Sequence, residues 1–256
     1  MLEARRLVKR FFGHAVIDHV SFAVRRGEVV GYLGPNGSGK TTTTRILTGL
    51  LEATSGAVLF DGRETRLDPI EFRRRLGYVP EEPHLYPFLS GREYLELVGR
   101  LRELAPSSMD RKIGALLDLF GLSDAGEQAI SSYSKGMKQK VLVIAALLHD
   151  PDLLIFDEPD SGLDVTTGLV MRHLVTNLAA RGKAILYTSH ILDIVERLCT
   201  RVIVLHEGRV VADDSVKQLR TLLASSSLEE VFTHLVVRRD PERIARDIAD
   251  VVTVGA

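Results

Sequence analysis

A glycine-rich segment near the N-terminus has the residue types and spacing of a phosphate-binding loop. It reads GPNGSGKTT and directly follows the apolar stretch 28–33. Its glycines let the backbone bend tightly and approach a phosphate, and a helix beginning near Gly39 would direct free N–H groups at the anion. Lys40 is placed to reach the β- and γ-phosphates of a nucleotide, and the Thr41 hydroxyl to bind Mg²⁺. The predicted nucleotide-binding residues are Gly34, Pro35, Asn36, Gly37, Ser38, Gly39, Lys40, Thr41 and Thr42.

Two carboxylates follow another apolar stretch later in the chain. Residues 153–156 are all apolar and lead into Asp157 and Glu158. Ligands of parallel sheets bind at the carboxyl ends of the strands. Asp157 is therefore predicted to hold Mg²⁺ directly or through water, and Glu158, one residue further, to act as the general base that polarises an attacking water. A phosphate loop together with such a carboxylate indicates nucleoside triphosphate chemistry.

The whole chain has the composition of a globular α/β protein. It has 256 residues, 45% of them hydrophobic and 26% charged, with a net charge of −1. That charge gives no general attraction to nucleic acid or anionic lipid. The longest apolar run, 141–148, is much shorter than the roughly 20 residues of a membrane span, and the first residues lack the apolar run of a signal peptide. A single cysteine, Cys199, excludes an internal disulfide and suits a reducing cytosol.

The pattern of apolar residues predicts the elements that position these groups. The first 33 residues are expected to be rich in strands, and a short helix is expected at 41–50. Strand signals vanish between about 83 and 150, where helices are expected at 91–104, 109–120 and 134–149. Buried strands at 153–157 and 184–188, separated by a helix at 166–181, indicate a mainly parallel sheet. The serines at 225–227 predict a junction between a domain at 1–224 and a small extension at 225–256, a charged amphipathic tail ending in 251–254.

Several segments occur in the order found in ATP-binding cassette (ABC) ATPases, and the chain resembles that family over roughly residues 5–220. These segments are 34–42, 133–137, 153–158, 161–164 and 189–190. The segment YSKGM at 133–137 is similar to the family's signature loop, usually LSGGQ, but Tyr133, Lys135 and Met137 depart from it. The resemblance implies the α/β fold of P-loop NTPases: a mainly parallel sheet, an antiparallel β subdomain and an inserted α-helical subdomain. It also implies ATP and Mg²⁺ as cofactors.

The resemblance further implies a site shared between two copies of the chain. Ser134, Lys135 and Gly136 would bind the γ-phosphate of an ATP held by the other monomer of a homodimer. Asp164, in the segment SGLD, would link the two sites across the interface. His190 resembles the histidine that hydrogen-bonds the γ-phosphate, and together with Lys40 would stabilise its charge.

Two further residues are assigned by position. Phe12 resembles the aromatic residue that stacks on adenine, and the neighbouring Phe11 is an open alternative. Glu81 stands where the family normally has a glutamine that contacts Mg²⁺ and relays to the membrane partner. A carboxylate can still bind Mg²⁺ but adds negative charge near the phosphates. The strings GYVPEE, YSKGMK and SLEEVF resemble the ATPase subunits of bacterial type-2 exporters.

The resemblance therefore implies an ATP-hydrolysing subunit that powers a separate membrane permease, an exporter, through ATP-driven dimer closure. Such a subunit lies on the cytoplasmic face of the membrane through its permease, and no nucleic-acid partner is expected. One alternative is a soluble ABC ATPase acting on nucleic acid or ribosomes, but the chain has one phosphate loop, no heptad run and no basic excess. A kinase or GTPase with the same loop would leave 133–137 and His190 unexplained, and the guanine-specific pattern N-K-x-D is missing.

Overall fold

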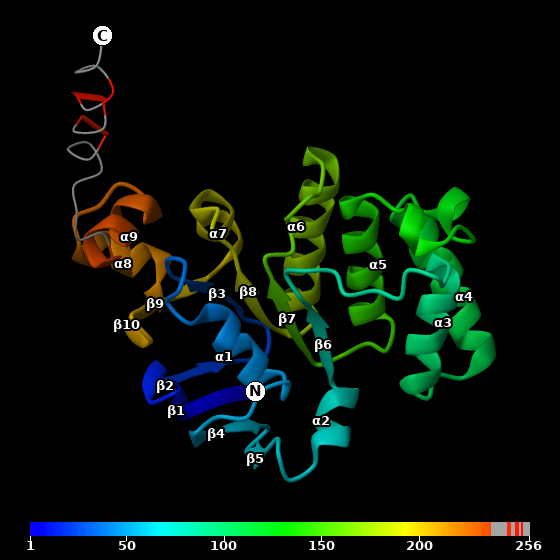
Figure 1. The fold of residues 1–256 in the computed structure, drawn as a ribbon, viewed down its shortest axis with the longest axis horizontal. Helices are drawn as coiled ribbons and strands as arrows, with labels where there is room; N and C mark the ends of the chain where they lie inside the picture. Colours follow the sequence, from blue (N-terminus) through cyan, green and yellow to red (C-terminus); the bar gives the residue numbers. More distant parts are fainter. Residues whose placement is uncertain (237–244, 247–248, 251, 253–256) are drawn as a thin grey trace.

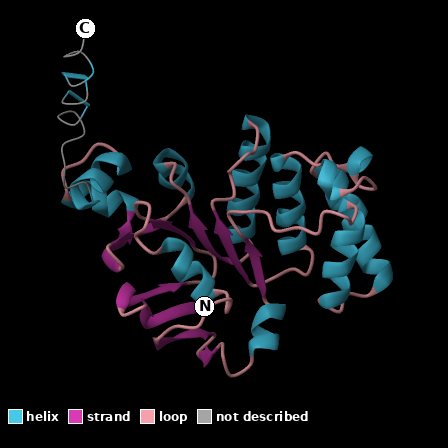
Figure 2. Ribbon diagram, in the orientation of Figure 1, coloured by secondary structure: helices cyan, strands magenta, loops and turns pink. Residues whose placement is uncertain are grey.

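A six-stranded sheet forms the centre of the molecule (Figures 1 and 2). The computed structural model describes residues 1–236, 245–246, 249–250 and 252. Neighbouring strands of this sheet run parallel, except that its edge strand β10 is antiparallel to β9. Every residue of β3, β7 and β8 is buried, as expected for parallel strands covered on both faces. In spatial order the strands are β10 (Arg209–Ser215), β9 (Arg201–His206), β3 (Val29–Leu33), β8 (Ala184–Thr188), β7 (Leu153–Asp157) and β6 (Leu76–Val79).

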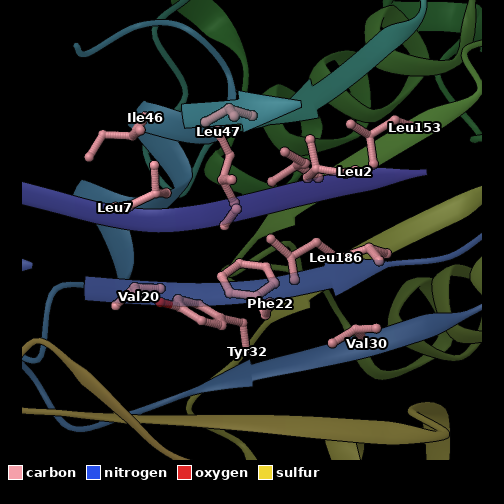
Figure 3. Packing of buried hydrophobic residues seen from close by; sticks show 14 of the residues in the cluster. Leu2, Leu7, Val20, Phe22, Val30, Tyr32, Ile46, Leu47, Leu153 and Leu186 are labelled. Atoms are coloured by element: carbon pink, nitrogen blue, oxygen red, sulfur yellow. The ribbon is translucent and has the colours of Figure 1, made fainter. Parts of the chain in front are cut away.

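A second, antiparallel sheet lies over one face of the first. Its order is β2 (His14–Val24), β1 (Leu2–Phe11), β4 (Ser55–Phe60) and β5 (Arg63–Glu64). Between the two sheets packs α1 (Lys40–Leu47), and side chains from all three layers form one core (Figure 3). Within it the rings of Phe22 and Tyr32 lie 5.3 Å apart between centroids. The expected fold class, with its parallel sheet and antiparallel β part, is confirmed.

Helices cover the other face of the parallel sheet. Because successive side chains of a strand point to opposite faces, Val30 and Tyr32 of β3 face α1, while Val29 and Leu33 pack in the core on the other side. That second core takes side chains from α5 (Lys135–Leu147), α6 (Val165–Ala180), α7 (Leu192–Leu198), α8 (Val216–Leu222) and α9 (Leu228–Val236). A short helix, α2 (Pro69–Arg74), leads into β6.

A third core holds together the helical part of the chain. It joins α3 (Gly91–Leu101), α4 (Pro106–Leu119) and α5 (Lys135–Leu147), with the short turns η1 (Ser123–Ala125) and η2 (Ile130–Ser132) between the last two. Ser90 begins α3 with a capping box to Glu93. Helix α5 contributes to both the second and the third core, so it connects this part to the sheet. The predicted boundaries at 83, 150 and 224 stay predictions.

Some expected elements differ from the observed ones. The N-terminal strands are longer than their apolar runs, since β1 and β2 pair over ten or more residues with register shifts that interrupt the alternation. The helix expected at 41–50 ends at Leu47, before Gly49 adopts a positive φ of 71°. Beyond the serines at 225–227, α9 buries Leu228 and Val231. The expected end of the tail at 251–254 falls, apart from residue 252, outside the described residues. No helix that the structure describes combines the length and apolar character needed to span a bilayer.

Candidate nucleotide-binding site

The predicted phosphate loop connects β3 to α1, as its sequence indicates. Two of its glycines are required by close contacts. A Cβ on Gly34 would lie 2.4 Å from both the Leu205 carbonyl oxygen and the Ser38 hydroxyl oxygen. Gly39 has a φ of 107°, and a Cβ there would lie 2.5 Å from the Cδ1 atom of Ile17. Larger residues would therefore displace the loop from the neighbouring strands β9 and β2.

Two positive features point to anion binding at this loop. Gly39 precedes α1 without a side-chain cap, so the first N–H groups of the helix remain available to a ligand. The ammonium of Lys40 donates hydrogen bonds to the carbonyl oxygens of Gly34 at 2.6 Å and Pro35 at 3.3 Å. Burial lowers the pKa of Lys40, and the nearby carboxylates of Glu158 and Asp157 oppose that shift. The loop thus combines helix N–H groups with a partly desolvated cation, which a phosphate would neutralise.

Asp157 ends β7 and is held from two sides. Its Oδ1 atom accepts a hydrogen bond from the Thr188 hydroxyl at 2.6 Å, and its Oδ2 atom accepts one from the Thr44 hydroxyl at 2.9 Å. Sequence reasoning missed both threonines. One signal was available for Thr44, which lies one helical turn after Thr41 and therefore on the same side of α1. For Thr188 the signal was its position beside the segment Ser189–His190.

The oxygen atoms of this site fit a magnesium ion that takes its remaining ligands from a bound nucleotide and from water. Each Asp157 oxygen accepts one bond and has a further lone pair, and the Thr41 hydroxyl lines the same hollow. Within the described part of the chain, no group of three or more His, Cys, Asp or Glu residues is arranged to hold a metal by itself. Mg²⁺ in nucleotide sites typically takes one or two protein oxygens and fills its shell with phosphate oxygens and water.

Glu158 is oriented by an unusual backbone conformation and by His190. Its φ is 50°, and its N–H donates to the Thr188 hydroxyl at 3.0 Å. Its Oε2 atom contacts the Nδ1 atom of His190 at 2.7 Å and accepts from the His190 N–H at 3.2 Å. An ionised carboxylate can only accept, so Nδ1 carries the proton in this pair. The Glu158 side chain is 11% exposed and that of His190 72%, which places the imidazole at the mouth of the site.

A hollow of about 430 Å³ brings half of the predicted site residues together. Its lining consists of Val16, Asn36, Gly37, Gly39, Lys40, Thr41, Thr42, Glu81, Asp157 and Glu158. Phe11 and Phe12 are not in this lining; they lie at the turn between β1 and β2, with Phe12 fully exposed and Phe11 40% exposed. A larger hollow of about 630 Å³ between α7 and α8 contains none of the predicted site residues, so size alone does not identify the site.

Four other predicted residues, from the segments 134–136 and 161–164, form a second group, which does not line this hollow. Ser134 caps α5 by accepting a hydrogen bond from the Met137 N–H at 3.2 Å. Lys135 donates to the Ser161 hydroxyl at 2.7 Å. Asp164 caps α6, and its hydrogen bonds from the hydroxyl and N–H of Thr167 hold its pKa below the usual range. Gly136 follows in the first turn of α5. Within one chain, these residues therefore lie outside the hollow that the phosphate loop lines.

Known proteins resemble this chain in both sequence and fold. The family model described as ABC transporter matches residues 17–161. The Bacillus subtilis "ABC transporter ATP-binding protein NatA" is 38% identical over 223 residues, which cover 87% of this chain and 91% of that protein. The Escherichia coli "Probable multidrug ABC transporter ATP-binding protein YbhF" is 32% identical, over 94% of this chain and 43% of that protein.

Two solved structures extend the similarity to the fold. One described as "Structure of ATP binding subunit of ABC transporter" superposes with a TM-score of 0.87 at 35% identity, covering 92% of this chain and 99% of the other. "Dimeric structure of a post-hydrolysis state of the ATP-binding cassette MJ0796 bound to ADP and Pi" gives 0.77 at 25% identity, covering 84% and 98%. The chain therefore belongs to the ABC transporter family, as an ATP-binding subunit that hydrolyses ATP with Mg²⁺.

Proposed function

We propose that this chain powers a separate membrane exporter, and that two copies close head-to-tail around two ATP molecules. The observation that carries the proposal is the division of the predicted residues into two groups on one chain. The phosphate loop, Asp157 and Glu158 share one hollow, whereas Ser134, Lys135 and Gly136 lie outside its lining. A second copy, placed head-to-tail, would bring the second group to the first. The dimeric cassette among the related structures supports this arrangement.

Within each composite site the residues have distinct tasks. The helix N–H groups and Lys40 bind the phosphates, while Asp157 and Thr41 hold the magnesium ion, with Glu81 as a further ligand or as a contact to the permease. Bound Mg²⁺ neutralises part of the phosphate charge. Glu158 accepts a proton from the attacking water, and His190 and Lys40 stabilise the charge that develops on the γ-phosphoryl group. Phe12 or Phe11 stacks on adenine.

Coupling to a permease would use the loop around Glu81. This loop leads to Tyr86 and Phe88, which are 61% and 92% exposed, and then to the helical part of the chain. Closure and reopening of the dimer would move this loop and pull the permease between two states at the cytoplasmic face of the membrane. Export is supported by the resemblance of three sequence segments to the ATPase subunits of bacterial type-2 exporters. The word multidrug in the description of YbhF also supports it. No nucleic-acid partner is needed.

The variant Glu158→Gln tests the composite site. The amide has nearly the same shape but cannot accept the proton, so we expect turnover to fall by about 10²–10⁴-fold while ATP binding persists. With Mg²⁺ and ATP the variant should elute as a dimer in size-exclusion chromatography with light scattering. The exposed Glu103, which pairs with Arg74, supplies the control variant Glu103→Gln, with normal turnover. Normal turnover by Glu158→Gln would contradict the assigned base.

The export direction requires the permease. If a gene for a multi-span protein lies beside this one, the two products can be reconstituted together in vesicles with this chain on the outside. We expect the permease to change the ATPase rate and ATP to drive substrate into the vesicles. An ATPase rate that does not respond to that permease would argue against this partner, and ATP-driven loss of substrate from the lumen would indicate import.

A further inference from the structure

The turn that follows Glu158 is tied to β8 by a contact between the half-buried side chain of Asp160 and the buried side chain of Tyr187. The hydroxyl of Tyr187 donates a hydrogen bond to the Oδ2 atom of Asp160. Tyr187 is fully buried in β8, where its ring packs against Phe156 with centroids 6.1 Å apart. The other oxygen of Asp160, Oδ1, is buried without a hydrogen-bond partner, and burial raises the pKa of this carboxyl. Neither residue has a task in the site described above.

This contact lies close, along the chain, to Thr188 and to the turn that carries the proposed base. Tyr187 directly precedes Thr188, whose hydroxyl bonds both Asp157 and the Glu158 N–H. Asp160 is two residues after Glu158, and the Ser161 N–H closes the turn by donating to the Glu158 carbonyl oxygen at 3.1 Å. The turn therefore begins at β7 and is fastened to β8 at Asp160.

Glu158 needs such fastening because its backbone is strained. A positive φ in a residue other than glycine costs about 1–3 kcal/mol and persists only where the surrounding structure fixes it. From the opposite side, Lys135 of α5 holds the adjacent Ser161 through its hydroxyl. The turn is thus held between β8 and α5, and the Tyr187 hydroxyl is, beside that of Thr188, a side-chain anchor on the sheet.

We propose that Asp160 and Tyr187 are a positioning pair whose hydrogen bond aims Glu158 at the attacking water and at His190. The inference rests on the proposed role of Glu158 as general base. Asp160 and Tyr187 act through the backbone of the turn and touch none of the reacting atoms. A purely structural role for Tyr187 would reside in its ring, which packs against Phe156 with or without the hydroxyl.

Removing only the hydroxyl separates these roles. In Tyr187→Phe the ring remains, so its packing against Phe156 is kept, and the groups that bind phosphate are unaltered. We expect kcat to fall about tenfold, as loss of one hydrogen bond of about 1.4 kcal/mol would give, with KM for ATP within about twofold. Tyr94→Phe, on α3, is the matched control and should keep both constants.

Variants of the partner test whether the two residues act together. Asp160→Asn keeps an oxygen that can accept from Tyr187 and should retain most of the activity. Asp160→Leu removes the acceptor and should lower kcat as Tyr187→Phe does. The double variant Asp160→Leu/Tyr187→Phe should be no slower than the slower single variant, because both changes break the same bond.

Three results would overturn the inference: an unchanged kcat in Tyr187→Phe, a raised KM at constant kcat, or multiplicative losses in the double variant. Glu158→Gln, measured in parallel, separates this inference from the proposed function. If Glu158→Gln abolishes turnover while Tyr187→Phe has no effect, the positioning pair fails and the proposed function stands. If Glu158→Gln turns over normally, the assignment of the base itself fails.

Discussion

At the scale of single residues, the predicted metal site depends on the two hydroxyls that hold Asp157 as well as on the carboxylate itself. Asp157 is 2% exposed, and a buried carboxylate is stable only when donors surround it. Thr44 supplies one donor from α1 and Thr188 another from β8. The two bonds fix the direction of the carboxylate before any ion binds, which reduces the rearrangement needed to hold Mg²⁺.

The variant Thr44→Val tests this support. Valine has the shape of threonine without the donor, so one Asp157 oxygen loses its partner in a buried setting. We expect about 1–3 kcal/mol lower free energy of unfolding, and a higher Mg²⁺ concentration for half-maximal ATPase activity. Urea unfolding and a Mg²⁺ titration measure the two effects. Thr176→Val is the control, since Thr176 is exposed and bonds within its own helix. An unchanged Mg²⁺ dependence would show that Thr44 does not support the metal site.

At the scale of elements, a histidine connects the end of α5 to β6. The Nε2–H of His149 donates to the Leu76 carbonyl oxygen at 2.9 Å, and its Nδ1 atom is buried without a partner. Burial, reinforced by the nearby Arg102 charge, lowers the pKa of His149 to about 4. Protonation would add a second donor at Nδ1 with no acceptor to receive it.

The contact predicts a dependence of stability on pH. The folded pKa of about 4 lies below the unfolded value of about 6.5, so the unfolded chain binds more protons between these values. The contribution of neutral His149 is therefore complete above about pH 6.5 and is lost as the pH falls towards 4. We expect the melting temperature to drop more between pH 7.5 and 5 in the wild type than in His149→Gln, which keeps an N–H donor. His84→Gln, at an exposed position, should drop as much as the wild type; equal slopes in all three proteins would exclude His149 as the cause.

At the scale of the whole molecule, the proposed composite site predicts complementation between two inactive variants. Lys40→Ala impairs the half of a site that the phosphate loop forms, and Ser134→Arg impairs the half that the other copy supplies. Each variant alone should therefore be nearly inactive. In a head-to-tail dimer of one of each, both changes fall in one site and the other site is intact. Random mixing makes about half of the dimers mixed, so we expect up to about a quarter of the wild-type ATPase rate.

Two measurements complete the complementation test. Cross-linking of tagged chains establishes that mixed dimers form; their formation without any recovered activity would contradict a shared site. A dilution series of the wild-type protein should show a rate per chain that rises with concentration until the dimer is saturated.

The sequence by itself determined the features that depend on neighbouring residues. The glycines and the lysine at 34–40 identify a phosphate-binding loop, because the chemistry of that loop depends on residues adjacent in the chain. The apolar runs before Asp157 and at 184–188 indicated buried parallel strands. The order of elements and the family followed from these segments. Helix and strand ends were less accurate, because caps, bulges and positive φ angles decide them residue by residue.

Only the tertiary structure decided which distant side chains meet. The strand order places β8 beside β7, and this brings Thr188 to Asp157 and His190 to Glu158, 31 and 32 residues apart in the chain. The same neighbourhood joins Tyr187 to Asp160, two residues for which the sequence offered no assignment. Apolar periodicity fixes which face of a strand is buried but leaves open which strand lies next to it. That choice depends on packing over the whole sheet, and it determines the surroundings of the carboxylates.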